Sequence, residues 1–376
     1  MNSSIDFRDV KCSSGNLVVG KSIPMSCLCY TIFRLDPYIG CRHDCVYCYT
    51  KFFPSLRPSV IGVRRDLPKV FSRIVLELSR RGIPVPVFRL SELTDGFQPI
   101  ERKLRLSYQL MQTCLRYEVP LIISTKSDMI AESPWIDVIK ELVDRKLAYV
   151  QYTLTLLDDE DAKILEPFAP LPSRRMRAME ILRDEGVPLV LRFQPIIPYV
   201  STGIDYIEEY VETAESLGVK HIIGEFLRIH SWRVLNELKR LHRKDRDFYK
   251  LFNRGFWINY PLASCKHPPR AFRRRVYENI NCICSRHGIK FSTCRETFFN
   301  YILDKDCCGV YLLRKRILRF TLYEHMYGVR EDYKYITNSH VARMPHSAFK
   351  SKIMNHITIL LKTMDNKKLM ELLLNN

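Results

Sequence analysis

Residues 36–49 read DPYIGCRHDCVYCY, so Cys41, Cys45 and Cys48 stand at the spacing C-x3-C-x2-C. Three thiolates on one short loop can ligate three irons of a cubane [4Fe–4S] cluster and leave the fourth iron open to another ligand. This loop therefore predicts a metal centre, and the residues that follow it along the chain have to build the scaffold that holds it.

Zinc is the alternative metal for the same loop. A structural zinc site needs four ligands and usually takes two separate cysteine pairs. His43 or His230 would have to complete the set. The spacing therefore favours an iron–sulfur cluster over zinc.

The sequence around this loop alternates short β-rich runs with amphipathic helical stretches, which is typical of βα units around a parallel sheet. Six strands are predicted, at 28–34, 85–93, 121–125, 149–156, 189–196 and 221–227. Helices are predicted at 66–81, 101–117, 134–145, 173–185 and 205–217. Six units are too few for a complete eight-stranded barrel, so we expect an α/β fold, a partial (β/α)6 TIM-like barrel. In such barrels the chemistry lies at the C-terminal ends of the strands.

The pattern changes near residue 229 to basic helical segments and a cysteine-rich stretch. We therefore expect an N-terminal extension at 1–27, the barrel at 28–228 and a basic, mainly helical C-terminal region at 229–376.

Charge follows the same division. Residues 1–227 hold 29 Lys and Arg against 29 Asp and Glu, whereas residues 228–376 hold 30 against 12, so the whole net charge of +18 lies in the C-terminal part. A field this concentrated attracts polyanions, among which nucleic acid is the commonest partner. Basic residues alternate with aromatic ones at 270–277 and 311–320, which suits phosphates and stacked bases. The alternative is a solvated basic face.

No run of 18 apolar residues occurs, and the first nine residues carry acids where a signal peptide needs a basic end and an apolar segment. We therefore expect a cytoplasmic protein with no membrane partner. Thirteen cysteines in a reducing compartment indicate metal or redox work rather than disulfides.

The cysteine loop resembles that of the radical S-adenosylmethionine (SAM) superfamily, in which an aromatic residue, here Tyr47, precedes the third cysteine. Within that superfamily the chain is similar to the spore photoproduct lyase-like (DNA repair photolyase-like) branch. The further matching blocks lie at 94–101, 124–127, 165–170 and 194–198.

The resemblance implies a role for each matching residue. Cys41, Cys45 and Cys48 would hold a [4Fe–4S] cluster. Four positions would contact SAM: Tyr47 at the adenine, Thr94 and Asp95 at the amino group, and Lys126 at the carboxylate. Thr153 would add a hydroxyl to the same pocket. Without the resemblance, Asp95 reads as the start of a turn with Gly96, and Lys126 as a surface lysine.

The resemblance also implies the reaction. A reduced cluster, fed by an electron donor such as a ferredoxin or flavodoxin, would cleave SAM to methionine and a 5′-deoxyadenosyl radical, which takes hydrogen from the substrate. Combined with the basic C-terminal region, this predicts a radical SAM enzyme acting on DNA or RNA. Two alternatives remain: a radical SAM enzyme for a protein or small molecule, and a non-enzymatic iron–sulfur or zinc protein that binds nucleic acid.

One residue departs from the family. Spore photoproduct lyases commonly carry a hydrogen-donating cysteine immediately before the pair that matches Thr94 and Asp95, and this chain has Leu93 there. We therefore expect a reaction other than the usual repair of spore photoproduct.

Three arginines and one acid have open assignments. Glu166 lies in a proline-bounded loop after the fourth predicted strand, where it would reach ribose or substrate. Arg174 and Arg175 begin a helix, where positive charge is unfavourable unless an acid is bound, and the surface is the simpler location. Arg192 lies in the fifth strand and faces either the barrel interior or the helices.

A second group of cysteines lies in the C-terminal region. They are Cys265, Cys282, Cys284, Cys294, Cys307 and Cys308. Four of them would suffice for a second cluster or a zinc site, but their spacing matches no standard ligand framework. The alternatives are buried thiols that pack as small hydrophobes and a single thiol that donates hydrogen at the barrel mouth.

Overall fold

The computed structural model describes residues 6–20, 29, 32–53, 55, 60–241, 246–298, 301, 306–313, 317–319, 333–335, 338–367 and 370–371. Seven parallel strands form its central sheet. In spatial order they are β2 (Arg34–Leu35), β5 (Phe88–Leu90), β6 (Leu121–Thr125), β7 (Ala148–Thr153), β8 (Leu189–Ile196), β9 (His221–Phe226) and β12 (Lys290–Thr293).

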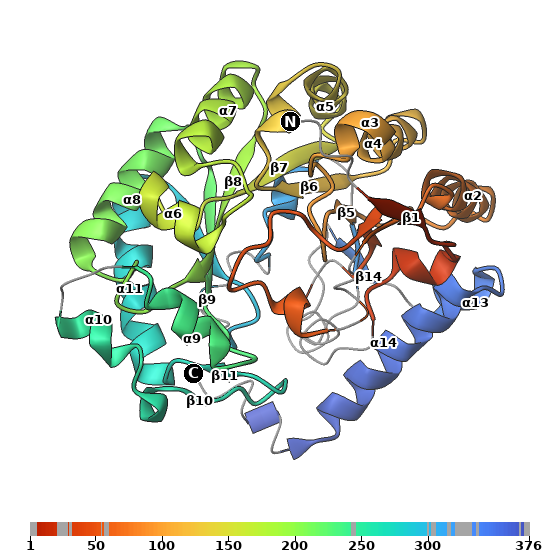
Figure 1. Ribbon diagram of the computed structural model, residues 1–376. Coiled ribbons are helices and arrows are strands. Elements are labelled where there is room, and N and C mark those ends of the chain that lie inside the picture. Colours follow the sequence, from red (N-terminus) through yellow and green to blue (C-terminus); the bar gives the residue numbers. More distant parts are fainter. Residues whose placement is uncertain are drawn as a thin grey trace.

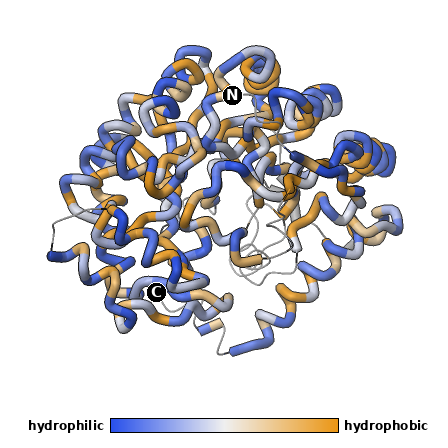
Figure 2. Tube along the Cα trace, viewed as in Figure 1, coloured by the Kyte–Doolittle hydropathy of each residue, from blue (hydrophilic) through white to orange (hydrophobic). Residues whose placement is uncertain are grey.

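Helices surround this sheet on its outer side, and the strands curve into an open barrel (Figure 1). The helices between successive strands are α2 (Leu67–Arg80), α3 (Glu101–Leu104), α4 (Leu106–Arg116), α5 (Trp135–Asp144), α6 (Asp159–Leu165), α7 (Pro172–Asp184), α8 (Ile204–Ser216) and α11 (Arg270–Arg286). Hydrophobic and hydrophilic residues alternate along these helices, as expected for elements that cover a core on one side only (Figure 2). The predicted partial barrel is confirmed.

Three departures from the predicted strands and helices are local. The strand predicted at 85–93 is only Phe88–Leu90, because Pro86 lacks a ladder N–H and Ser91 turns to φ 72°. The helix predicted at 101–117 breaks at Arg105, which has φ 51°. α6 was not predicted; the side chain of Asp158 caps its first turn.

The largest departure is the seventh strand. β12 pairs in parallel with β9, from Lys290 beside His221 to Thr293 beside Gly224. Gly224 makes this packing possible, because a Cβ there would lie 3.1 Å from the Phe291 ring. The sheet therefore takes one strand from the stretch assigned to the C-terminal region. The division of the chain at residue 228 stays a prediction.

The first predicted strand, at 28–34, is observed only as Arg34–Leu35, and residues 28, 30 and 31 lie outside the described part. Beside it, β1 (Phe7–Asp9), β4 (Ile61–Val63) and β3 (Tyr38–Ile39) form a small separate sheet. The cysteine loop connects β3 to β4 and includes the 3-10 turn η2 (Tyr49–Phe52).

The described residues after Arg228 form more helix than strand. They contain α9 (Arg233–Leu238), α10 (Arg246–Lys250), α11, α13 (Asn338–Arg343) and α14 (Ala348–Met364), with short strand pairs β10 (Ile258–Asn259) with β11 (Lys266–His267) and β13 (Ile317–Arg319) with β14 (Tyr333–Tyr335). The long α14 lies along the open side of the barrel (Figure 1). Phe349 of α14 packs on Phe33, with ring centroids 5.7 Å apart, so this helix covers the β2 side of the barrel.

Residues 306–313 fill the barrel interior. Cys307, Cys308 and Val310 pack against inward-facing side chains such as Tyr149 and Val190. The Tyr149 hydroxyl donates to the Cys308 carbonyl over 2.6 Å, and the Gln151 amide donates to the same oxygen over 2.7 Å. Residues 306–313 thus fill the interior of the barrel near the N-terminal ends of β7 and β8.

Among the described residues, no helix is both long and apolar enough to cross a membrane.

Candidate functional site

A cavity of about 700 Å³ opens at the C-terminal ends of the barrel strands. All eight predicted site residues line it: Cys41, Cys45, Tyr47, Cys48, Thr94, Asp95, Lys126 and Thr153. They come from the cysteine loop and from the ends of three neighbouring strands, β5, β6 and β7. The structure therefore brings the whole predicted set together, and each residue's role toward a cofactor stays a prediction.

The cysteine loop is held by two other sequence blocks. Gln98 donates its amide to the Gly40 carbonyl over 3.1 Å and accepts from the Arg42 N–H over 3.1 Å. The Val46 N–H donates to the Leu165 carbonyl over 2.8 Å. Both blocks, 94–101 and 165–170, are among those that carry the family resemblance, and here they fix the position of the loop.

The three loop cysteines have no disulfide partner; Cys45 is buried, and Cys41 and Cys48 are partly exposed. Burial raises the pKa of the Cys41 thiol to about 12. A cysteine that binds a metal must be a thiolate. Binding of the metal cation would therefore have to lower this raised pKa.

Among the described residues, no three His, Cys, Asp or Glu side chains gather closely enough to hold one metal ion. This argues against a preformed zinc site on this loop. A cubane cluster takes one thiolate for each ligated iron, so its thiolates need not converge on a single point. Three free thiols along one cavity wall fit that requirement.

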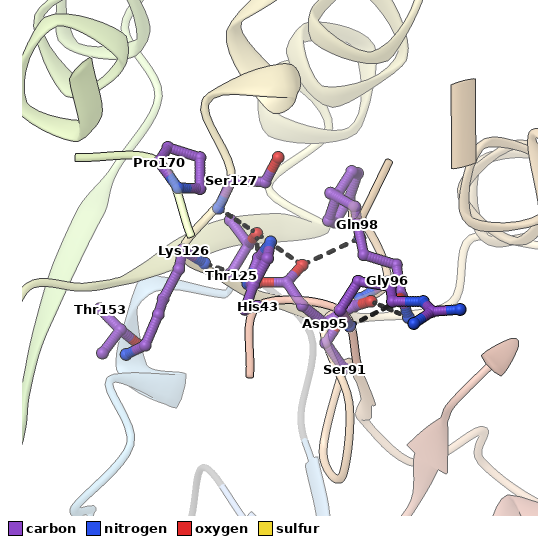
Figure 3. A network of polar contacts seen from close by, with 12 residues as sticks. His43, Ser91, Asp95, Gly96, Gln98, Thr125, Lys126, Ser127, Thr153 and Pro170 are labelled. Carbon is purple, nitrogen blue, oxygen red and sulfur yellow. Dashed lines mark hydrogen bonds and ion pairs between the residues drawn. The ribbon is translucent and has the colours of Figure 1, made fainter. Parts of the chain in front are cut away.

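Asp95 ties the ends of β5 and β6 together (Figure 3). Its carboxylate accepts from the Phe97 N–H over 2.9 Å, from the Thr125 hydroxyl over 2.8 Å and from the Lys126 N–H over 2.8 Å. His43 of the cysteine loop also reaches it, with Nδ1 at 3.5 Å. Asp95 therefore does begin a turn, as considered from the sequence. Its carboxylate also orients the cysteine loop and Lys126.

Lys126 is not a surface lysine. Its Nζ lies 3.4 Å from a Glu166 oxygen and 5.7 Å from the centroid of the Tyr47 ring. In Figure 3 its side chain extends to the same side of the network as Thr153. The ammonium group therefore lies at the cavity wall, where an anionic ligand can reach it.

Glu166 and Arg175 form a buried ion pair behind this wall. Arg175 is fully buried, which corrects the expectation that it lies on the surface. Glu166 also accepts a hydrogen bond from the Tyr47 hydroxyl. Although burial alone would raise it, Arg175 and Lys126 lower the pKa of Glu166 to about 2. Arg174, by contrast, is exposed and pairs with Asp128.

A second charged cluster lines the cavity, on β8 and at the ends of β9 and β12. Arg192 faces the cavity, which settles its open orientation. Glu225 lies 3.1 Å from Arg228 and 3.0 Å from Arg295. The sequence interpretation missed Glu225, Arg228 and Arg295. Glu225 and Arg228 lie at the end of a strand that was predicted, so their position was an available signal. Arg295 follows β12, which was not predicted, so it had no such signal.

The C-terminal cysteines do not form a second metal site among the described residues, so that expectation finds no support. Cys265, Cys284, Cys307 and Cys308 are buried, Cys294 is half-buried and Cys282 is exposed. Cys265 lines the cavity. Of the N-terminal cysteines, Cys12 and Cys29 are buried and form no disulfide among the described residues, and Cys27 lies outside the described residues.

Residues 35–214 match the radical SAM superfamily. An uncharacterized protein of Methanocaldococcus jannaschii is 25% identical over 261 residues, covering 67% of this chain and 85% of the relative. A protein of Pseudomonas phage M6 named radical SAM Nα-GlyT isomerase is 23% identical over 266 residues, covering 69% of this chain and 53% of its own length.

Solved structures of spore photoproduct lyase share the fold. One, complexed with dinucleoside spore photoproduct, superposes with a TM-score of 0.54 at 13% identity, covering 76% of this chain and 81% of the lyase chain. Another, with bound AdoMet and dinucleoside spore photoproduct, gives a TM-score of 0.53 at 13% identity, with 70% and 76% coverage. At these identities the likeness concerns the fold.

Proposed function

We propose, because residues 35–214 match the radical SAM superfamily, that Cys41, Cys45 and Cys48 hold a [4Fe–4S] cluster with which the protein cleaves SAM and modifies nucleic acid. The observation that carries this proposal is that the three thiols, Asp95 and Lys126 line one cavity of about 700 Å³. The family itself implies an enzyme with an iron–sulfur cluster and SAM.

The bound cofactors would supply a 5′-deoxyadenosyl radical able to abstract hydrogen from an unactivated C–H bond. The chain's own residues have to bind SAM and the substrate, orient them and keep water away from them. Lys126 offers an ammonium group to the methionyl carboxylate. Its position is fixed on two sides, by the Asp95 carboxylate at its backbone N–H and by Glu166 at its Nζ.

Tyr47 and Thr153 would contact the nucleoside part of SAM. The Tyr47 hydroxyl is anchored on Glu166 and lies 3.1 Å from the Thr155 hydroxyl. The ring is therefore held in a single orientation at the cavity wall, which suits packing against a flat base. Thr94, whose hydroxyl donates to the Tyr38 carbonyl over 3.2 Å, fixes the β5 end beside the site of the amino group.

Nucleic acid as the substrate is supported by the charge division between a neutral half and a half with net +18. α11 runs antiparallel to the strands it packs on, because it leads into β12, so its N-terminal turns lie at the same edge of the barrel as the cavity. Arg274 and Arg275 of these turns are exposed. Arg273 is not available, since it is buried against Glu296.

The alternating aromatics of this segment are only partly exposed. Val276 and Tyr277 are buried in the core, and Phe272 packs on Tyr199, with ring centroids 5.2 Å apart. The segment can therefore offer cations to a phosphate backbone but few rings to bases. The second basic cluster, at 314–316, lies outside the described residues.

The test is an anaerobic assay of the reconstituted protein with labelled SAM and candidate DNA and RNA substrates, with a ferredoxin or flavodoxin as electron donor. Deuterium transfer from a labelled nucleic acid into 5′-deoxyadenosine supports the proposal. SAM cleavage that responds only to a peptide or small molecule would assign a different substrate. No SAM cleavage at all would favour a non-enzymatic iron–sulfur protein.

A further inference from the structure

Charged side chains line the cavity unevenly. Five are cationic and three are carboxylates: Arg34, Lys126, Arg192, Arg228 and Arg295 against Glu92, Asp95 and Glu225. Four of the five cations form ion pairs, namely Arg34 with Asp36, Lys126 with Glu166, and Arg228 and Arg295 with Glu225. For Arg192 no carboxylate of the described residues lies within ion-pair distance.

Arg192 is nevertheless held in a fixed orientation. Its Nε donates to the Gln194 amide oxygen over 2.7 Å, and its Nη1 donates to the Gln151 amide oxygen over 3.3 Å. Neutral amides orient a guanidinium without cancelling its charge. Arginine has five N–H donors, so the remaining ones can serve a ligand in the cavity.

The neighbouring residues add positive charge. Arg228, Arg295 and Arg192 all act on Glu225 and, against the effect of burial, lower its pKa. Glu296 takes a further contact from Arg228, at 3.3 Å, and is also paired with Arg273. Arg228, Arg273 and Arg295 thus share two carboxylates, Glu225 and Glu296. Arg192 adds a further charge beside them, and a partly enclosed cavity strengthens the field of these groups.

This cluster lies apart from the residues proposed for the methionyl end of SAM. Asp95 and Lys126 follow β5 and β6, whereas Arg228 follows β9 and Arg295 follows β12, at the other end of the sheet order. Arg192 lies between the two groups, on β8, where it pairs in register with Thr153 of β7. The cavity therefore has two charged ends, and the second is a candidate for the substrate.

We propose that Arg192, with Arg228 and Arg295 beside it, binds a phosphate group of the substrate inside the cavity. Guanidinium groups match the oxygens of a phosphate in a two-point geometry that a neutral nucleoside does not offer. The inference rests on the proposed function and narrows its substrate to a nucleotide or a phosphodiester, placed with its phosphate on the β8–β12 side.

The test compares two probes on the anaerobically reconstituted protein: a thymine dinucleotide with its natural phosphodiester and the same dinucleotide with an uncharged methylphosphonate linkage. We expect the charged probe to bind more tightly. Arg192→Gln should reduce its affinity roughly tenfold or more, as for the loss of charge-assisted hydrogen bonds, and abolish the preference. Arg192→Lys should retain part of the preference for the charged probe. Arg177→Gln, which changes an exposed arginine of α7, is the control.

Equal binding of the two probes by the wild-type protein would overturn the inference. So would an unchanged preference in Arg192→Gln, with its fold verified by circular dichroism. If Arg192→Gln weakens binding of labelled SAM but not of the charged probe, Arg192 serves the cofactor and the inference is wrong. Failure of the wild-type protein to bind SAM or assemble a cluster would instead refute the proposed function, since phosphate binding is measured separately.

Discussion

Arg175 and Glu166 form an ion pair in which neither side chain is more than 1% exposed. Arg175 lies in the first turns of α7, where its positive charge is unfavourable to the helix dipole, and the negative charge of Glu166 offsets this effect. Because Glu166 also contacts Lys126 and Tyr47, the pair connects the helix layer to two residues of the cavity wall.

The first prediction concerns this pair. Glu166→Gln leaves the guanidinium of Arg175 buried without a counter-charge, so we expect it to lower the free energy of unfolding by about 3–5 kcal/mol. Glu132→Gln is the matched control, because Glu132 pairs with Arg102 at the surface and such pairs contribute up to about 1 kcal/mol. Urea unfolding at pH 7 measures both, and equal effects would contradict the prediction.

The second prediction concerns His221, which is buried under the barrel with Nε2 2.7 Å from the Ser292 hydroxyl. Burial, with a smaller effect of Lys290, lowers its pKa to about 3. Below about pH 6.5 an unfolded histidine takes up a proton that the folded one refuses. Stability should therefore fall as the pH drops from about 6.5 toward 3.

His221→Gln should reduce this pH dependence without abolishing it, because His267 is also held neutral, with a pKa of about 3. The comparison is urea unfolding of both proteins at pH 5 and pH 8. A difference between them that does not change with pH would show that His221 is not the group responsible.

The third prediction concerns the basic face of α11. Arg274→Glu with Arg275→Glu should weaken nucleic-acid binding and flatten the plot of log affinity against log salt. Each lost phosphate contact accounts for roughly 0.7–0.9 of that slope. Arg177→Glu on α7 is the control, since Arg177 is also exposed and lies in the electrically neutral half. Unchanged affinity and slope would assign nucleic-acid docking to another surface.

The fourth prediction concerns Leu93, which lines the cavity at the position where spore photoproduct lyases commonly have a cysteine. A leucine C–H bond does not donate hydrogen as a thiol does. The purified protein should therefore fail to convert spore photoproduct cleanly to two thymines, in an assay that follows both products by chromatography. Efficient conversion would contradict this, and Cys265→Ala would then show whether this thiol, which lines the cavity outside the cysteine loop, replaces the missing cysteine.

Much of the fold follows from local pattern. The strands at 121–125 and 189–196 were predicted with the bounds observed for β6 and β8, because each begins with a short run of aliphatic residues and lies between two helical patterns. Glycines 82, 186 and 218 close helices with positive φ, as expected for residues just past a last turn. These signals are short-range and therefore visible in sequence.

What was missed depends on contacts between distant segments. Lys290–Thr293 is a four-residue strand that pairs with β9 about 70 residues earlier, and residues 306–313 enter a barrel whose interior only the folded sheet defines. Arg273 and Arg175 look like surface arginines in sequence, and only their acidic partners explain why they are buried: Glu296, which follows β12, and Glu166, in the loop that precedes α7. Sequence spacing identified the cysteine triad, but not the arginine cluster that lines the same cavity.

The central claim is that Cys41, Cys45 and Cys48 hold the cluster that cleaves SAM. The most direct test is anaerobic reconstitution of the triple Cys→Ala variant beside the wild-type protein, with Cys282→Ala, which removes an exposed thiol of α11, as the control. We predict that the wild type and the control bind iron and sulfide, absorb visible light and cleave SAM, and that the triple variant does none of these. Cluster assembly and SAM cleavage that survive in the triple variant would contradict the assignment.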